Sequence, residues 1–197
     1  VGRDQILADF RDALDDPESS ASVLALSGPE GIGKGRVLAE LAWERQERGW
    51  RGFHTAGGPN TRAPFAGVVE LLAPALMNAP ASLIAAHARE LVKVLPQHPR
   101  LAGITPSPAL DGRTERGVLI HQIGAFLSSY AAVQDCPVLI AVTSIGQLDS
   151  ACLDVLAELA YRRGEVTDPG GRIHVLVTLE DRLGQAAEEW TESLRSK

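Results

Sequence analysis

Hydrophobic and polar positions follow one another along the chain with two different spacings. In residues 2–14 apolar side chains recur every three or four positions, as on one face of a helix. Residues 137–142 instead form an almost uninterrupted apolar run, typical of a central strand buried on both faces of a parallel sheet. Strand-like and helix-like segments alternate, which predicts an α/β fold: a parallel sheet with helices on both faces. The predicted strands are residues 22–26, 51–55, 137–142 and 173–178, and the predicted helices are residues 2–14, 34–48, 65–77, 82–95, 113–133 and 150–163.

Two polar or proline-rich segments interrupt this pattern. Residues 15–20 (DDPESS) break the first helical segment, so residues 1–20 are expected to form an N-terminal helix and a linker that leads into the core. Residues 96–112 contain prolines at four positions and are expected to be largely irregular. With 197 residues, 45% of them apolar, and no internal repeat, the chain is expected to form a single domain over residues 1–197.

A glycine-rich segment joins the first predicted strand to the next helix. Gly28, four further residues, Gly33 and Lys34 make most of a P-loop, in which backbone N–H groups surround phosphates and the lysine reaches the outer ones. Gly35 stands where that pattern has a Ser or Thr whose hydroxyl is a Mg²⁺ ligand. The sequence therefore predicts a phosphate-binding loop without its metal ligand, although an ordinary strand-to-helix connection remains an alternative. The loop residues expected to contact a nucleotide are Gly28, Glu30, Gly31, Ile32, Gly33, Lys34, Gly35 and Arg36.

Composition and charge narrow the range of partners. The formal net charge is −6 and Lys and Arg form no stripe along any predicted helix, so we expect no direct contact with nucleic acid or with an anionic membrane. No apolar run approaches the ~18 residues that a membrane span needs. Cys136 and Cys152 fit no metal or redox spacing, which favours a reduced, cytoplasmic protein without disulfides. Because the chain begins at Val1 without a methionine, we expect it to be a fragment of a longer chain.

Four segments, in this order, resemble the AAA-like STAND NTPase domains of bacterial multidomain regulators. They are residues 1–4 (VGRD), 27–36 (SGPEGIGKGR), 61–65 (TRAPF) and 137–160. The resemblance implies a three-layer P-loop NTPase fold that lacks its final strand and helical lid after Leu194. It also implies ATP or ADP as the ligand, with Val1, Gly2 and Arg3 lying against the adenine. Without the resemblance, Arg3 would be read as a surface residue of the first helix.

The sequence departs from this family at the positions that carry its chemistry. Thr143 and Ser144 stand where two consecutive acids are expected after the third strand, and Glu180 stands where relatives carry an arginine near the γ-phosphate. A neutral hydroxyl neither balances the charge of Mg²⁺ nor accepts a proton from water near neutral pH. Since phosphoryl transfer depends on positioning and charge stabilisation, these losses predict a P-loop domain that is catalytically inactive, with no catalytic residue, no metal ligand and no tightly bound Mg²⁺.

Two functions remain open from the sequence. The first is a degenerate nucleotide-binding regulatory module of a larger bacterial signalling or transcription-regulatory protein, which binds ATP or ADP weakly or not at all. Its partners would be neighbouring domains of its own longer chain, with self-association as a further possibility. The alternative is a weak ATPase switch that uses Asp149 or Glu180 as a substitute acid, although Asp149 also suits a helix N-cap and Glu180 a solvated acid at the start of the last helix. A P-loop kinase for a small molecule lacks the same acids and shows no arginine-bearing lid.

Overall fold

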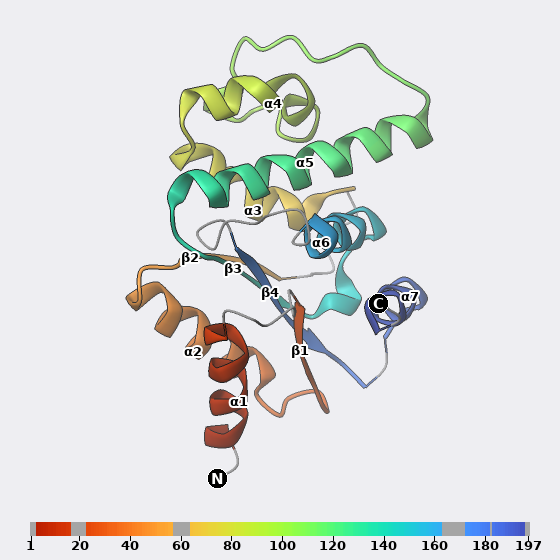
Figure 1. Cartoon of the computed structure of the whole chain (residues 1–197). Helices are drawn as coiled ribbons and strands as arrows, with labels where there is room; N and C mark the ends of the chain where they lie inside the picture. The colour runs from red at the N-terminus through yellow and green to blue at the C-terminus, as the bar shows by residue number, and fades with distance from the viewer. Residues whose placement is uncertain (1–2, 17–22, 57–63, 163–171, 182, 196–197) are drawn as a thin grey trace.

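A central parallel sheet organises the computed structural model, which describes residues 3–16, 23–56, 64–162, 172–181 and 183–195 (Figure 1). In these ranges the sheet has four strands in the order β1-β4-β3-β2, and every neighbouring pair is parallel. The strands are β1 (Val23–Ser27), β2 (Arg51–Ala56), β3 (Val138–Thr143) and β4 (Ile173–Leu179). The helices are α1 (Arg3–Asp15), α2 (Lys34–Glu47), α3 (Ala66–Asn78), α4 (Ala81–Val94), α5 (Gly112–Gln134), α6 (Ser150–Arg162) and α7 (Gln185–Arg195), with short 3-10 turns at η1 (Pro99–Leu101) and η2 (Ile145–Gln147).

The two inner strands of the sheet are its most buried ones. All seven residues of β4 and the first five of β3 are buried, whereas β1 and β2 are edge strands of the described sheet with several exposed positions. This arrangement confirms the prediction that the strand near residue 137 lies inside the sheet. The register pairs Val138 with Ile173 and Val23 with Val175, so β1 reaches the sheet through the strand that lies farthest from it in sequence.

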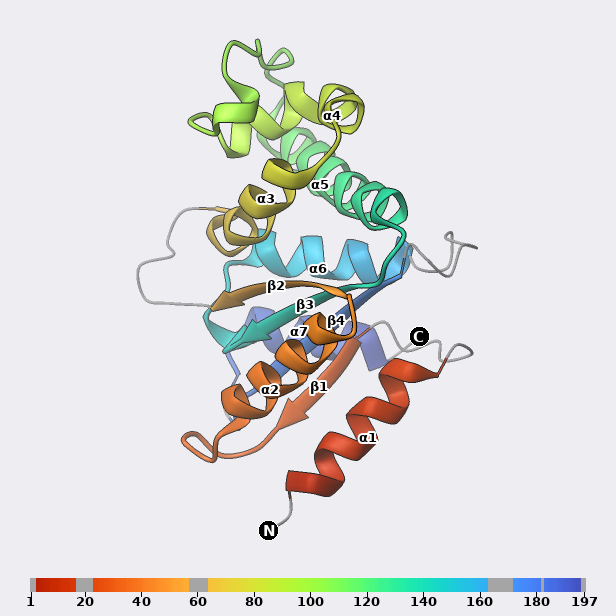
Figure 2. The same ribbon diagram turned by 90° about the vertical axis from the view of Figure 1, so that its left-hand side faces the viewer.

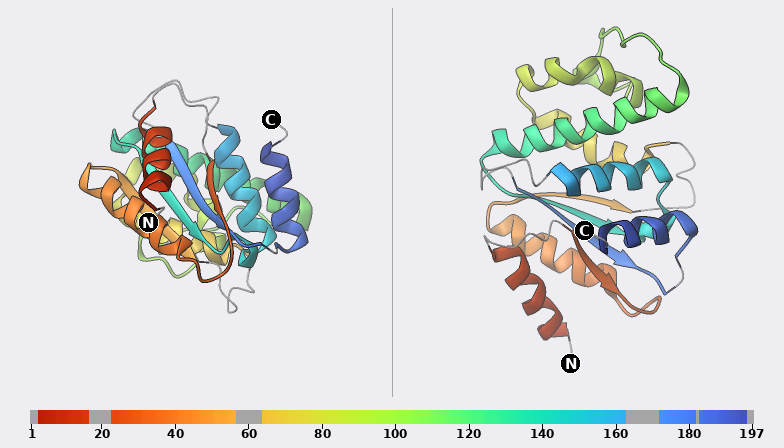
Figure 3. Two further views of the ribbon diagram at one scale, coloured as in Figure 1. Left: turned by 90° about the horizontal axis from the view of Figure 1, so that it is seen from below. Right: turned by 45° about the vertical axis from the view of Figure 1, so that its right-hand side comes forward.

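Helices cover both faces of the sheet and give three layers (Figure 2). On one face, alternate strand residues such as Leu139 and Leu176 pack with Leu38 and Leu41 of α2 and with Leu7 of α1. On the other face the intervening strand residues pack with α3, α5, α6 and α7 in the larger core. Helix α4 packs on α5 at a distance from the sheet, as the right-hand view of Figure 3 shows. The predicted α/β fold with helices on both faces is therefore confirmed.

The connection from β2 to β3 carries most of the helical mass of the larger core. It contains α3, α4 and α5, together with the proline-rich segment 96–111, which is irregular as predicted apart from η1. Arg100 fixes this segment, because its guanidinium donates to the carbonyls of Met77 (3.0 Å) and Ala79 (3.1 Å). No helix in the described ranges is both long and apolar enough to cross a bilayer.

Candidate functional site

The glycine-rich loop lies at the carboxyl end of β1. It runs from Gly28 to Gly33 and leads directly into Lys34, the first residue of α2, as the sequence predicted (Figure 2). Because all four strands are parallel, the carboxyl ends of β1, β3 and β4 meet at the same edge of the sheet. Residues that follow β3 and β4 are therefore brought close to this loop.

The loop backbone depends on glycine most clearly at Gly31 and Gly33. Gly31 has φ +77° and Gly33 has φ +97°, which is left-handed backbone that other residues adopt only with strain. A Cβ at Gly33 would also lie 2.6 Å from the Arg3 guanidinium. Within the loop, Ile32 N–H donates to Pro29 O (3.4 Å).

The N–H groups at the start of α2 are open donors. Among the described residues, no acceptor pairs with the N–H of Gly31, Gly33, Lys34 or Gly35. The first turn of any helix leaves such donors unsatisfied, and together with the helix dipole they favour an anion. The loop and α2 therefore present an arrangement suited to a phosphate.

Lys34 folds back over the loop rather than extending into solvent. Its ammonium donates to Gly28 O (2.6 Å) and to Pro29 O (2.9 Å). The side chain is half-buried, so its charge is held within the loop. A phosphate placed against the loop amides would compete with these two carbonyls for the ammonium.

A cavity of about 420 Å³ opens beside the loop. Helix α1 forms one of its walls with Arg3 and Ile6, and Arg3 Nη2 lies 3.4 Å from Ile32 O. This volume is in the range of sites for small organic ligands. The remaining lining residues are Leu26, Ser27, Ile32, Gly33, Lys34 and Val37.

The structure thus brings four of the nucleotide-contact residues expected from the sequence, Arg3, Ile32, Gly33 and Lys34, into the wall of one cavity. Arg3, from the N-terminal segment, meets the loop at Ile32 and Gly33. Of the other predicted loop residues, Glu30, Gly31, Gly35 and Arg36 are exposed and Gly28 is half-buried, and none of these five is among the residues that line the cavity. Val1 and Gly2 lie outside the described residues. The periodicity of the first helix indicated that Ile6 is apolar, but nothing in the sequence indicated that it lines a cavity.

The N-terminal end of α2 meets the carboxyl end of β3 at Gly35 and Thr143. A Cβ built on Gly35 would lie 3.7 Å from Thr143 Cγ2, which is ordinary van der Waals contact. Thr143 Oγ1 lies 3.4 Å from His54 Nε2 at the end of β2. Sequence analysis missed His54, although pairing of Ala56 with Thr143 places the two strand ends side by side. No group of three or more His, Cys, Asp or Glu that could hold a metal ion occurs in the part of the chain described.

Ser144 has a structural role through its backbone. Its backbone is left-handed (φ +58°) and its N–H donates to Thr178 Oγ1 of β4 (2.9 Å). This bond ties the ends of β3 and β4 together. The hydroxyl of Thr178 therefore serves as a structural hydrogen-bond acceptor.

Asp149 caps α6. Its Oδ1 accepts from the N–H of Ala151 (2.9 Å) and Cys152 (3.1 Å), and also from Phe65 N–H (3.3 Å), which lies at the start of α3. Its Oδ2 accepts from the Cys152 thiol (2.8 Å). Burial and this carboxylate raise the pKa of Cys152 to about 12. The helix-cap interpretation of Asp149 is confirmed, and the bond to Phe65 is a contact that sequence analysis did not find.

Glu180 follows β4 and lines a different cavity from the one beside the glycine-rich loop. Its Oε2 is 3.0 Å from the position of a Cβ built on Gly146, and it lines a second cavity of about 330 Å³ with Ser27, Asp181 and two glutamates of α7. The prediction that Glu180 lies at the start of the last helix was wrong, because α7 begins only at Gln185, and the first helical bonds run from the N–H groups of Ala187 and Glu188 to Gly184 O.

Comparison with known families covers most of the elements described above. The profile of the AAA ATPase domain matches residues 1–178, which include α1, the glycine-rich loop, β3 and nearly all of β4. No curated protein sequence matches the chain. The matched length, the parallel sheet and the loop at the end of β1 agree with one another, and the chain belongs to the AAA ATPase domain family.

Proposed function

We propose that this domain binds ATP or ADP in the loop and the adjoining cavity and does not hydrolyse it at a useful rate. On this proposal it is a STAND-type regulatory module of a larger bacterial signalling or transcription-regulatory protein. Its partners are neighbouring domains of that chain, and a second copy of itself is a further candidate. The AAA family match supports the nucleotide-binding part of the proposal.

One observation carries the binding proposal: open N–H donors stand directly beside a cavity of ligand size. The donors of Gly33 to Gly35 suit the phosphates, and Arg3 and Ile6 supply a wall for the nucleoside. In binding, Lys34 would exchange its two carbonyl partners for phosphate oxygens. Both kinds of bond have the charged ammonium as donor, but anionic phosphate oxygens add a Coulomb attraction that neutral carbonyls do not, so the exchange is favourable.

The residues near the outer phosphate position do not fit Mg²⁺. This cation prefers oxygen ligands, carboxylates above all, and Gly35 has no side chain while Thr143 offers one neutral hydroxyl beside an imidazole. The Asp149 carboxylate is already engaged by three backbone N–H groups and a thiol. Glu180 faces the other cavity. We therefore route no step of the proposed function through a metal ion.

The same residues offer hydrolysis no carboxylate base. Deprotonation of an attacking water needs an acceptor within hydrogen-bond reach, and the side chain that meets Gly35 is the neutral Thr143, whose Oγ1 lies 3.4 Å from the His54 imidazole. His54 is thereby a base candidate beside this position, and it adjoins Thr143 and not a carboxylate. A nucleotide that remains bound acts as a static ligand, since anything that binds the folded state stabilises it by mass action. Because α1 and α2 both line the cavity, such a ligand would fix these two helices relative to each other.

Calorimetry with ATP and with ADP, in Mg²⁺ and in EDTA, tests the proposal. We expect binding in both buffers, and we expect Lys34→Ala to weaken it at least tenfold. Arg89→Ala is the matched control, because it removes one positive charge from an exposed position on α4, on the opposite side of the sheet. Absence of binding at millimolar nucleotide would overturn the proposal.

Phosphate release separates the inactive module from an ATPase switch. We expect the wild-type chain to release phosphate no faster than Lys34→Ala. Turnover well above that variant would refute the claim of inactivity and favour the switch.

A further inference from the structure

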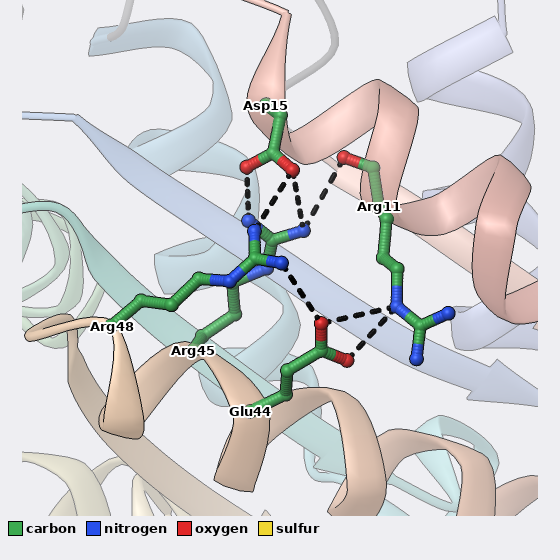
Figure 4. Close-up of polar contacts among 5 residues, drawn as sticks. All are labelled: Arg11, Asp15, Glu44, Arg45 and Arg48. Carbon is green, nitrogen blue, oxygen red and sulfur yellow. Dashed lines mark hydrogen bonds and ion pairs between the residues drawn. The ribbon is translucent and has the colours of Figure 1, made fainter.

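A charged cluster joins the C-terminal end of α1 to α2 (Figure 4). The Asp15 carboxylate binds the Arg45 guanidinium through both oxygens and also accepts from Arg48 Nη1 (3.1 Å). Glu44 accepts from Arg11 Nε (2.9 Å) and from Arg48 Nη2 (3.2 Å). We call these five side chains the α1–α2 clamp. It fixes a helix that is otherwise at the surface.

Arg45 is the buried member of the clamp. Its side chain is 0% exposed, its Nη2 also donates to Arg11 O (3.3 Å), and its guanidinium lies 5.1 Å from the centre of the Trp50 ring. Its Nε has no partner among the described residues. A buried guanidinium with one unsatisfied N–H depends strongly on the carboxylate that remains. Arg45 and Arg48 correspondingly hold the pKa of Asp15 below its usual value.

The other attachments of α1 are few. Only Leu7 and Leu14 of its residues are buried, with Ile6 and Phe10 partly buried beside them. At the end opposite Asp15, Arg3 and Ile6 form the helix wall of the cavity. An α-helix of this length is a rigid rod of roughly 18–20 Å, so its position at one end sets its position at the other.

We propose that Asp15 is a positioning residue for nucleotide binding: by pairing with buried Arg45 it holds α1 on α2, and thereby places Arg3 and Ile6 at the nucleoside side of the cavity. The inference rests on the function proposed above. Without the carboxylate, Arg45 stays buried and unpaired beneath α1. When α1 moves away from α2, water reaches the Arg45 guanidinium, and the cavity loses the wall formed by Arg3 and Ile6.

Asp15→Asn tests this inference against Asp12→Asn. Both changes remove one negative charge from an exposed position on α1, but Asp12 lies outside the clamp. We expect Asp15→Asn to weaken ATP binding at least tenfold and Asp12→Asn to change it less than twofold. Inorganic tripolyphosphate reports on the loop alone, and we expect its affinity to fall less than threefold in either variant. A residue that merely supported the fold would lower both affinities together.

Two further variants keep the test decisive if Asp15→Asn folds poorly. Asp15→Glu keeps the carboxylate and should retain ATP binding within about threefold of wild type. The double variant Asp15→Asn with Arg45→Met removes the stranded charge, because an apolar side chain can replace a buried ion pair, and should recover part of the loss. If ATP affinity is unchanged in Asp15→Asn, or if tripolyphosphate affinity falls as much as ATP affinity in a folded variant, the inference is overturned. If the wild-type chain binds neither ATP nor ADP, the proposed function fails instead.

Discussion

Replacement of Asp149 should cost the domain stability, and the structure indicates how much. In Asp149→Ala, the first turn of α6 loses an N-cap that bonds Ala151 and Cys152, a loss of about 1 kcal/mol. Phe65 N–H, partly buried at the start of α3, loses its acceptor as well, at a cost of about 1–3 kcal/mol. Together the free energy of unfolding should fall by about 2–4 kcal/mol, with the two effects taken as independent.

The loss in free energy of unfolding should depend on which side chain replaces Asp149. Asp149→Asn keeps an oxygen that can accept from the α6 N–H groups, so we expect a smaller loss of about 1 kcal/mol. Asp154→Ala is the matched control, since Asp154 lies on α6 but only makes an exposed ion pair with Arg116, worth about 0–1 kcal/mol. Urea denaturation by linear extrapolation measures all three losses.

One result would refute this reasoning. If Asp149→Ala unfolds within about 0.5 kcal/mol of wild type, the four bonds to the carboxylate are not structural. If phosphate release by the wild-type chain then disappears in Asp149→Asn while stability is retained, Asp149 is the substitute acid of an ATPase switch. The same pair of measurements therefore tests both interpretations of this residue.

Two other predictions concern the metal position and alkaline pH. We expect Mg²⁺-dependent ATP affinity to change little in either single variant, Gly35→Thr or Thr143→Asp. In the double variant, the gain in binding free energy should exceed the sum of the two single effects by about 1–3 kcal/mol, because the two positions touch. Additive effects, measured by calorimetry, would contradict that contact. Because the pKa of Cys152 rises from 9.0 to about 12 on folding, the folded state keeps a proton that the unfolded state loses. Stability should therefore be full below pH 9, fall as pH rises toward 12, and fall less steeply in Cys152→Ala, as urea denaturation at neutral pH and at about pH 11 would show.

The strands and helices could be predicted from the sequence because their signals are local. The apolar run at β3 and the glycines that end helices or form the loop carry their meaning within a few residues. Strand order could not be predicted in this way, because no residue in or near β1 indicates that its neighbour in the sheet is β4. The spacing of apolar residues therefore could not predict the order β1-β4-β3-β2.

The candidate site, too, could be predicted only in part from the sequence. The glycine spacing of residues 28–34 was sufficient to predict the loop, but the two bonds from Lys34 back to the loop carbonyls depend on side-chain packing. The approach of Arg3 to Gly33 was expected only through the family resemblance, and the α1–α2 clamp that accompanies it was not predicted. Ion pairs such as that of Asp15 with Arg45 join segments whose relative placement is set by tertiary structure.

The pairing of β1 with β4 has a consequence for the order in which the molecule assembles. Val23, near the start of the chain, reaches its sheet partner Val175 only after β2, the three helices that follow it, β3 and α6 have been made. Contacts so distant in sequence form slowly, because a long loop must close before they contribute any stabilisation. During synthesis, β1 therefore waits unpaired while β2 and β3 can already associate. The strand that leads into the glycine-rich loop therefore joins the sheet only once β4 is available, and a newly made chain cannot offer a complete nucleotide site until β4 has emerged.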